Sequence, residues 1–203
     1  FNRQSTTTTA WGVKLMRGRL NFGGLSHFTL VGSWSQTGGQ FLAGNSTVAT
    51  IGYFEDNPLT LSALPGNPFA NLRIGAANRD FYPAYVRALT PLEIGGKLIL
   101  FSGTFDPGVF THTVGGNWED MGASFSPASG TIRFAGSQPI QIGLSSWSRF
   151  NNIEIAGPST ATFMTGITAS SLTASRSGTA LVFASGSTYT FTSMSLGSPA
   201  LYD

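Results

Sequence analysis

The chain has 203 residues, of which 41% are hydrophobic and only 10% are charged, and its formal net charge at neutral pH is +2. An ordinary soluble domain carries roughly 25% charged residues, so hydroxyls, amides and backbone must cover most of this surface, and no strongly basic patch is available for nucleic acid. The absence of cysteine excludes disulfide bonds and thiolate metal sites, and no apolar run approaches the roughly 18 residues of a membrane span, so membrane insertion is not expected.

Short strands separated by glycine-containing turns are predicted along the whole chain. In chain order the clearest are RGRLNFGG from Arg17, HFTLVGSW from His27, LEIGGKLILFSG from Leu92, GTIRFAG from Gly130, TALVFASG from Thr179 and TYTFTSMSLG from Thr188. Apolar residues recur in them with the two-residue period of a strand, between closely spaced turn residues. The nearest candidate helix, RDFYPAYVRAL, is interrupted by Pro83, so the sequence predicts an all-β protein.

The chain repeats itself once. GSWSQTGGQFLAGNSTVATIG from Gly32 matches GNWEDMGASFSPASGTIRFAG from Gly116, with the tryptophans 84 residues apart, and PFANLRI from Pro68 matches RFNNIEI from Arg149. The second copy is longer upstream, within SGTFDPGVF. The copies cover about 13–75 and 92–156, and further strand segments fill 160–203, without a linker. One continuous domain, 1–203, is therefore predicted.

A unit of this length holds about four rungs of roughly 20 residues, which is typical of a parallel β-helix. The predicted fold is a right-handed parallel β-solenoid of about nine or ten rungs, in which residues 81 to 84 apart superpose four rungs along the axis. Six residues of the repeated Phe-x-Asn motif are predicted to fill the core: Phe69, Leu72, Ile74, Phe150, Ile153 and Ile155. Asn71 and Asn152 are predicted at turns.

The motifs SGTFD, VGGNW, GTIRFAG and FNNIEI together resemble the long strand repeats of large bacterial cell-surface and secreted proteins. The resemblance covers roughly residues 10–197, although the first copy lacks a counterpart of SGTFD. It implies an exported parallel β-helix with an adhesive or structural role, and it brings no catalytic residues.

The search for a chemical site in the sequence gives little. His27 and His112 could form a rung-to-rung pair, but turn or half-buried strand positions are the preferred interpretation. Carboxylates at Glu55-Asp56, Asp106 and Glu119-Asp120 could serve a β-helix polysaccharide lyase or hydrolase only if they gathered on one face. Asp106 precedes Pro-Gly and is predicted to form a turn. We therefore expect no enzyme activity, no metal and no cofactor.

The tryptophans separate into two groups. Trp34 and Trp118 occupy matched repeat positions and are predicted to pack in the core, whereas Trp147, in the variable loop, is the candidate for an exposed contact with a glycan. The basic cluster Lys14, Arg17 and Arg19 is predicted to be a solvated strand face rather than a nucleic-acid site.

The ends of a solenoid carry unpaired strand edges, which are usually capped. No cap is recognisable here, so the expectation is either that the chain is a part of a longer solenoid or that copies assemble head to tail, and we predict the second. The predicted interface comprises Thr6, Thr7, Thr8, Thr9, Trp11, Val13, Tyr189, Phe191, Met194, Leu196 and Leu201.

The function expected from these features is that of a structural subunit or segment of an extracellular bacterial surface assembly, such as a filament, sheath or adhesin. The partners would be copies of the chain itself, with surface glycans as further candidates. The alternative is a carbohydrate-binding module, and after it a β-helix lyase or hydrolase.

Overall fold

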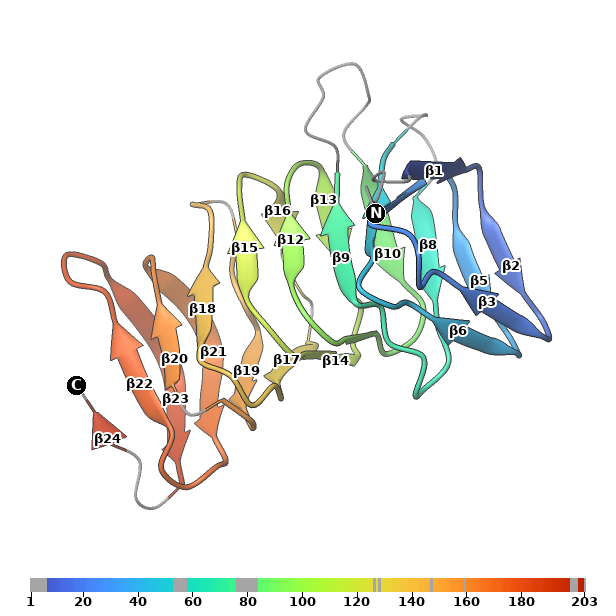
Figure 1. Cartoon of the computed structure of the whole chain (residues 1–203). Helices are drawn as coiled ribbons and strands as arrows, with labels where there is room; N and C mark the ends of the chain where they lie inside the picture. The colour runs from blue at the N-terminus through green and yellow to red at the C-terminus, as the bar shows by residue number, and fades with distance from the viewer. Residues whose placement is uncertain are drawn as a thin grey trace, which may run out of the picture.

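The computed structural model describes residues 7–52, 58–75, 84–125, 127, 129–146, 148–158, 160–197 and 201–202. In these ranges the chain forms only strands and turns, and parallel strands stack turn upon turn into a β-solenoid (Figure 1). The predicted all-β parallel solenoid is therefore confirmed. The coil has about eight turns, slightly fewer than the nine or ten expected.

The longest sheet, here called the long face, contains ten parallel strands that follow one another turn by turn. They are β1 (Thr7–Ala10), β4 (His27–Leu30), β7 (Thr47–Thr50), β9 (Asn71–Ile74), β12 (Leu98–Leu100), β15 (Trp118–Asp120), β18 (Ile140–Gly143), β20 (Thr160–Phe163), β22 (Ala180–Phe183) and β24 (Leu201–Tyr202). Each strand is hydrogen-bonded only to the strands one turn before and one turn after it.

Two further sheets of six strands complete the coil. The second face comprises β2 (Val13–Leu15), β5 (Trp34–Gln36), β8 (Leu59–Ser62), β10 (Tyr85–Ala88), β13 (Thr104–Asp106) and β16 (Ser124–Phe125). The third face comprises β11 (Glu93–Ile94), β14 (Thr111–Val114), β17 (Thr131–Phe134), β19 (Asn152–Ile155), β21 (Ile167–Ala174) and β23 (Tyr189–Leu196). In the first two turns the third side is the pair β3 (Arg19–Asn21) and β6 (Gln40–Leu42).

The cross-section changes along the axis. The second face ends at β16, and beyond it the described turns consist mainly of the long face with the third face behind it (Figure 1). The eight-residue strand β21 spans the remaining width by bending: Ala169 and Leu172 are buried, while Ser170 and Ser171 between them both face outward or are half-buried. The bend replaces a separate corner, so the single strand β21 covers the width that two shorter strands and a corner cover in earlier turns.

Alternate residues of each strand point into a continuous apolar core. Register places like residues above one another: Ile132 lies beside Ile153, and Phe134 beside Ile155. All six core residues predicted from the repeated motif are buried, at 2% exposure or less. Asn71 and Asn152 begin strands rather than forming turns, but the Asn71 amide oxygen does accept a hydrogen bond from the Lys97 backbone N–H, at 2.9 Å.

The two repeat copies do not superpose along the axis, so that prediction was wrong. Trp34 lies in β5 on the second face, whereas Trp118 lies in β15 on the long face. From Trp34 to Trp118 the chain advances by eleven sides of the coil. Four complete three-sided turns, which would place one tryptophan above the other, need twelve. The early turns are long, as in the 27-residue step from Trp34 to its partner Leu61. Because a long turn uses more residues for each side, the 84 residues between the two tryptophans complete eleven sides and not twelve.

The repeat nevertheless builds the same packing unit twice. Trp34, Phe41 and Phe69 have ring centroids 4.7, 5.2 and 5.7 Å apart. Their counterparts Trp118, Phe125 and Phe150 are separated by 4.7, 5.0 and 5.5 Å. The two tryptophans are 0% and 1% exposed. The repeated sequence therefore encodes the same aromatic core cluster twice, with both tryptophans packed in the core as predicted. In the second copy the tryptophan lies on the neighbouring face of the coil.

Glycines form a column at the corner that leads from the third face back to the long face. A Cβ on Gly115 would overlap the carbonyl of Gly95, and one on Gly136 would overlap the carbonyl of Gly115. These turns approach each other so closely because their backbones are hydrogen-bonded, with the Ala135 N–H donating to the Val114 carbonyl at 3.0 Å. The corner needs glycine for close approach rather than for an unusual φ angle.

Replacing Gly136 with alanine should destabilise the protein by about 2–3 kcal/mol, because the added methyl group must push apart two bonded turns. The matched change Gly24→Ala meets no atom within 4 Å and should alter the free energy of unfolding by about 0.5 kcal/mol or less. Urea unfolding followed by circular dichroism measures both. Equal stability of the two variants would contradict this account of the corner.

Candidate functional site

The described carboxylates are dispersed over the solenoid. Asp106 and Glu119 lie on the second and long faces, and Glu154 lies on the third. Glu55-Asp56, part of the sequence-based lyase hypothesis, lies outside the described residues. Among the described residues, no group of three or more His, Asp or Glu side chains is placed to hold a metal ion. No described helix is long and apolar enough to cross a membrane.

Asp106 holds a turn, as its Asp-Pro-Gly sequence predicted. One carboxylate oxygen accepts a hydrogen bond from the Gly108 N–H at 2.9 Å, and the other pairs with the Arg87 guanidinium at 2.8 Å. Burial alone would raise the pKa of Asp106, but these hydrogen bonds outweigh it and lower the pKa. Tyr85 completes an exposed cluster on this face by accepting from Arg87 at 2.9 Å.

Two other ion pairs also join neighbouring turns. Lys97 contacts Glu119 at 2.9 Å, and Arg133 contacts Glu154 at 3.3 Å. Exposed pairs of this kind contribute roughly 0–1 kcal/mol each. Asp120 bonds to the backbone of Gly122 and Ala123 and to the hydroxyl of Ser145. Every one of these carboxylates thus has a structural partner, and none faces a second carboxylate as an acid–base pair would.

The two histidines are far from each other in the coil. His27 is half-buried in β4 on the long face, and His112 is in β14 on the third face, three turns further on. The rung-to-rung histidine pair considered from the sequence is therefore absent. His112 is more buried than expected, with 1% exposure, between the rings of Phe105 and Phe110.

His112 is a structural residue held in one tautomer. Its Nδ1 accepts a hydrogen bond from the Leu92 N–H at 3.1 Å, and its Nε2 lies 2.8 Å from the Pro107 carbonyl. Since a carbonyl can only accept, Nε2 carries the proton and the ring is neutral. Burial lowers the pKa of His112, and the hydrogen bond to Pro107 opposes this only in part.

The predicted assembly residues do lie at the two ends of the described solenoid. Thr8, Thr9, Trp11 and Val13 belong to the first turn, and Tyr189, Phe191, Met194 and Leu196 belong to β23. Thr7 and Leu201 are in the terminal strands β1 and β24 of the long face. Thr6, and the proposed glycan contact Trp147, lie outside the described residues. Lys14 and Arg19 occupy strands and Arg17 the turn between them, all exposed, as predicted for a solvated face.

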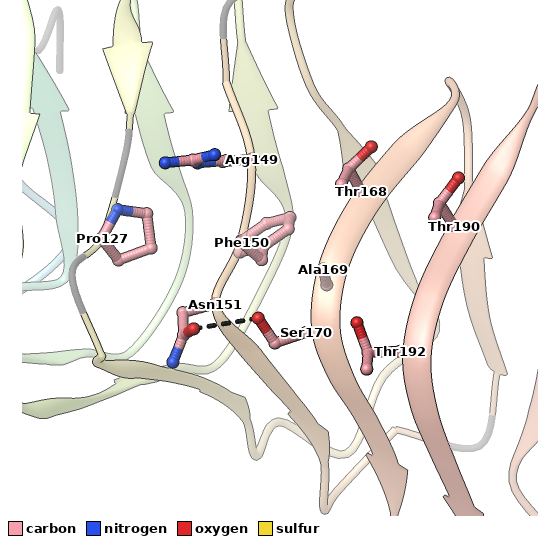
Figure 2. A pocket seen from close by; sticks show the side chains of 9 residues that line it. All are labelled: Pro127, Arg149, Phe150, Asn151, Thr168, Ala169, Ser170, Thr190 and Thr192. Atoms are coloured by element: carbon pink, nitrogen blue, oxygen red, sulfur yellow. Dashed lines mark hydrogen bonds between the residues drawn. The ribbon is translucent and has the colours of Figure 1, made fainter.

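A polar hollow that sequence reasoning missed lies where the second face ends (Figure 2). The described residues between β18 and β19 form no strand that pairs with β16, although the Arg149 N–H does donate a backbone hydrogen bond to the Phe125 carbonyl, at 3.0 Å. The hollow has a volume of about 270 Å³ and is lined by Pro127, Arg149, Phe150, Asn151, Thr168, Ala169, Ser170, Thr190 and Thr192. Alternating Thr and Ser in β21 and β23 was the signal available in the sequence, but nothing there placed Arg149 beside them.

No protein-family profile, curated protein or solved structure matches the chain. The resemblance to bacterial surface repeats therefore stays a prediction from the sequence motifs.

The buried neutral His112 makes stability dependent on pH. Because its pKa is lowered in the folded state from the ordinary value of 6.5, protonation favours the unfolded chain. The contribution of neutral His112 to the free energy of unfolding should be fully present above about pH 6.5 and should decrease as the pH drops toward the lower folded-state pKa. Unfolding by urea at a series of pH values should show this slope for the wild type, and a much smaller one for His112→Phe. The control His27→Gln should show the same slope as the wild type. A slope that is lost in His27→Gln and kept in His112→Phe would refute the assignment.

Proposed function

We propose that the protein is a structural, non-enzymatic segment of an extracellular bacterial surface assembly, whose coil continues end to end from one copy to the next. The observation that carries this proposal is the uncovered core at both ends of the described solenoid. The low charge, the hydroxyl-rich surface and the resemblance to surface-protein repeats support the extracellular setting.

The last described turn leaves core positions open. Inward-facing residues of β23 stack on buried residues of β21: Met194 lies beside Leu172, and Phe191 beside Ala169. Leu172 is fully buried, whereas Met194 is 46% exposed. Tyr189 and Phe191 surround Phe183, with ring centroids 4.9 and 6.3 Å from it. An aromatic and aliphatic surface thus ends the core where the next turn would cover it.

The first described turn is similar. Val13 lies beside the buried Trp34, and Leu20 beside the buried Phe41, yet both are only partly buried. Trp11, at the neighbouring corner, is 67% exposed. Strands β1, β2 and β3 pair, among the described strands, only with the turn that follows them.

Both ends of the described coil present edges of parallel strands, β1, β2 and β3 at the first turn and β23 and β24 at the last. An unpaired edge is a template for another strand. Contact between the end of one copy and the start of the next is head to tail, so it does not close on itself and produces a filament. The apolar ends would then be buried as a core interior is.

The lyase or hydrolase alternative has less support. Such a reaction needs carboxylates gathered on one face, about 5–10 Å apart for an acid–base pair. In the described ranges each carboxylate discussed above has its own structural partner, and the carboxylates are spread over all three faces. Incubation with neutral and anionic polysaccharides, with and without Ca²⁺, should therefore release no products.

A charge placed at the open end should block assembly. Met194→Lys puts an ammonium group on the exposed core of β23, and its desolvation on docking would oppose the contact. Met164→Lys is the matched control, since Met164 is also 46% exposed but lies at the corner after β20, where the next turn already follows it through the hydrogen bond from the Ala184 N–H to the Phe163 carbonyl at 3.0 Å. Sedimentation and electron microscopy should show filaments for the wild type and Met164→Lys, and monomers for Met194→Lys. A wild type that stays monomeric at high concentration would refute the proposal.

A further inference from the structure

The hollow beside β16 has the shape of a small binding site. Its floor is backbone, because Phe150 and Ala169 turn their side chains into the core, with 2% and 3% exposure. Its sides come from segments that are distant in the sequence: Pro127 follows β16, residues 149–151 precede β19, and the remainder belong to β21 and β23 (Figure 2).

Hydrogen-bonding side chains line this hollow in two rows that run along the solenoid axis. One row is Arg149, Thr168 and Thr190, and the other is Asn151, Ser170 and Thr192. Neighbouring members are fixed by the ladder: the Phe150 N–H donates to the Thr168 carbonyl at 3.0 Å, and Thr168 lies in register with Thr190. Members of a row are therefore about 4.8 Å apart, the distance between adjacent strands.

The second row is organised by its own hydrogen bond. The Ser170 hydroxyl donates to the Asn151 side-chain oxygen at 3.1 Å (Figure 2). The Asn151 amide nitrogen is thereby left as a donor, while the threonine hydroxyls can both donate and accept. Such a lining suits a ligand with many hydroxyl groups.

The hollow is positively charged. Among the described residues that line it, Arg149 is the only charged one, and none is a carboxylate. The nearest acidic residue along the same segment, Glu154, is already paired with Arg133 at 3.3 Å. Arg149 is exposed and has no carboxylate partner in the described part of the chain. Its planar guanidinium is suited to a carboxylate, which it can bind through two parallel hydrogen bonds.

We propose that this hollow, from Arg149 to Thr192, binds one residue of an acidic polysaccharide, with the sugar carboxylate on Arg149. The hydroxyl rows would bond the ring hydroxyls. At about 270 Å³ the hollow is smaller than the roughly 300–1,000 Å³ of sites for drug-sized ligands, so it holds a single ring while the chain extends along the solenoid. This site lies on the side of the coil and does not depend on end-to-end assembly.

The test compares two ligands that differ only in charge: a tetramer of galacturonate and its fully methyl-esterified form. Calorimetric titration of the wild type should detect the acidic tetramer, with affinity that falls at high salt, and should find the ester at least roughly tenfold weaker. Arg149→Gln should lose this preference. Arg17→Gln removes an exposed arginine in the turn between β2 and β3, at the other end of the solenoid, and should bind as the wild type does.

Thermal melting should show that both variants remain folded, because both arginines are exposed. Binding of the ester as tight as that of the acid, or unchanged binding by Arg149→Gln, would overturn the proposal. Free sulfate serves as a competitor: if it abolishes binding at concentrations equal to the sugar, the site recognises an anion and not a sugar, and the proposal fails. Absence of binding to either tetramer would also refute it.

Discussion

The parallel hydrogen-bond ladder between successive turns is the constraint on which this structure depends. Each strand bonds to the strands one turn away, so the register of one pair fixes the register of the next. Side chains of equivalent positions are then held about 4.8 Å apart in continuous stacks. Apolar residues stack well at that distance, as Ile153 does between Ile132 and Leu172. The core is therefore a column of similar residues, and the same aromatic cluster occurs twice within it.

The ladder also explains why the surface carries so few charges. Like charges stacked one strand apart would repel each other, so hydroxyls and amides occupy most outward positions. The three described ion pairs all join adjacent turns, with opposite charges stacked: Arg87 on Asp106, Arg133 on Glu154, and Lys97 beside Glu119. Close stacking likewise selects glycine where corners approach, as at Gly136. Composition and architecture are thus two consequences of one spacing.

The features with functional interest lie where the stacking is interrupted. At the two ends of the described coil, core residues such as Met194 have no further turn above them. Where the second face ends at β16, the chain around Arg149 forms no regular strand, and a hollow lies beside it. Regular turns satisfy their own backbone and bury their own apolar side chains, so they offer little to a partner. Where the stacking is interrupted, apolar and polar side chains remain available to a partner or ligand. Both proposals concern such positions.

The sequence by itself determined the fold class, the strand segments and the core residues, because a two-residue apolar period and glycine turns are local properties. It also determined that Trp34 and Trp118 pack alike, since their flanking residues repeat. Only the tertiary structure decided on which face each copy lies, because this depends on how many residues each turn consumes. The lengths of the turns also determine the burial of His112 and the position of Arg149 beside Thr168 and Thr190. Their positions follow from the summed lengths of corners and turns, and no local pattern encodes that sum.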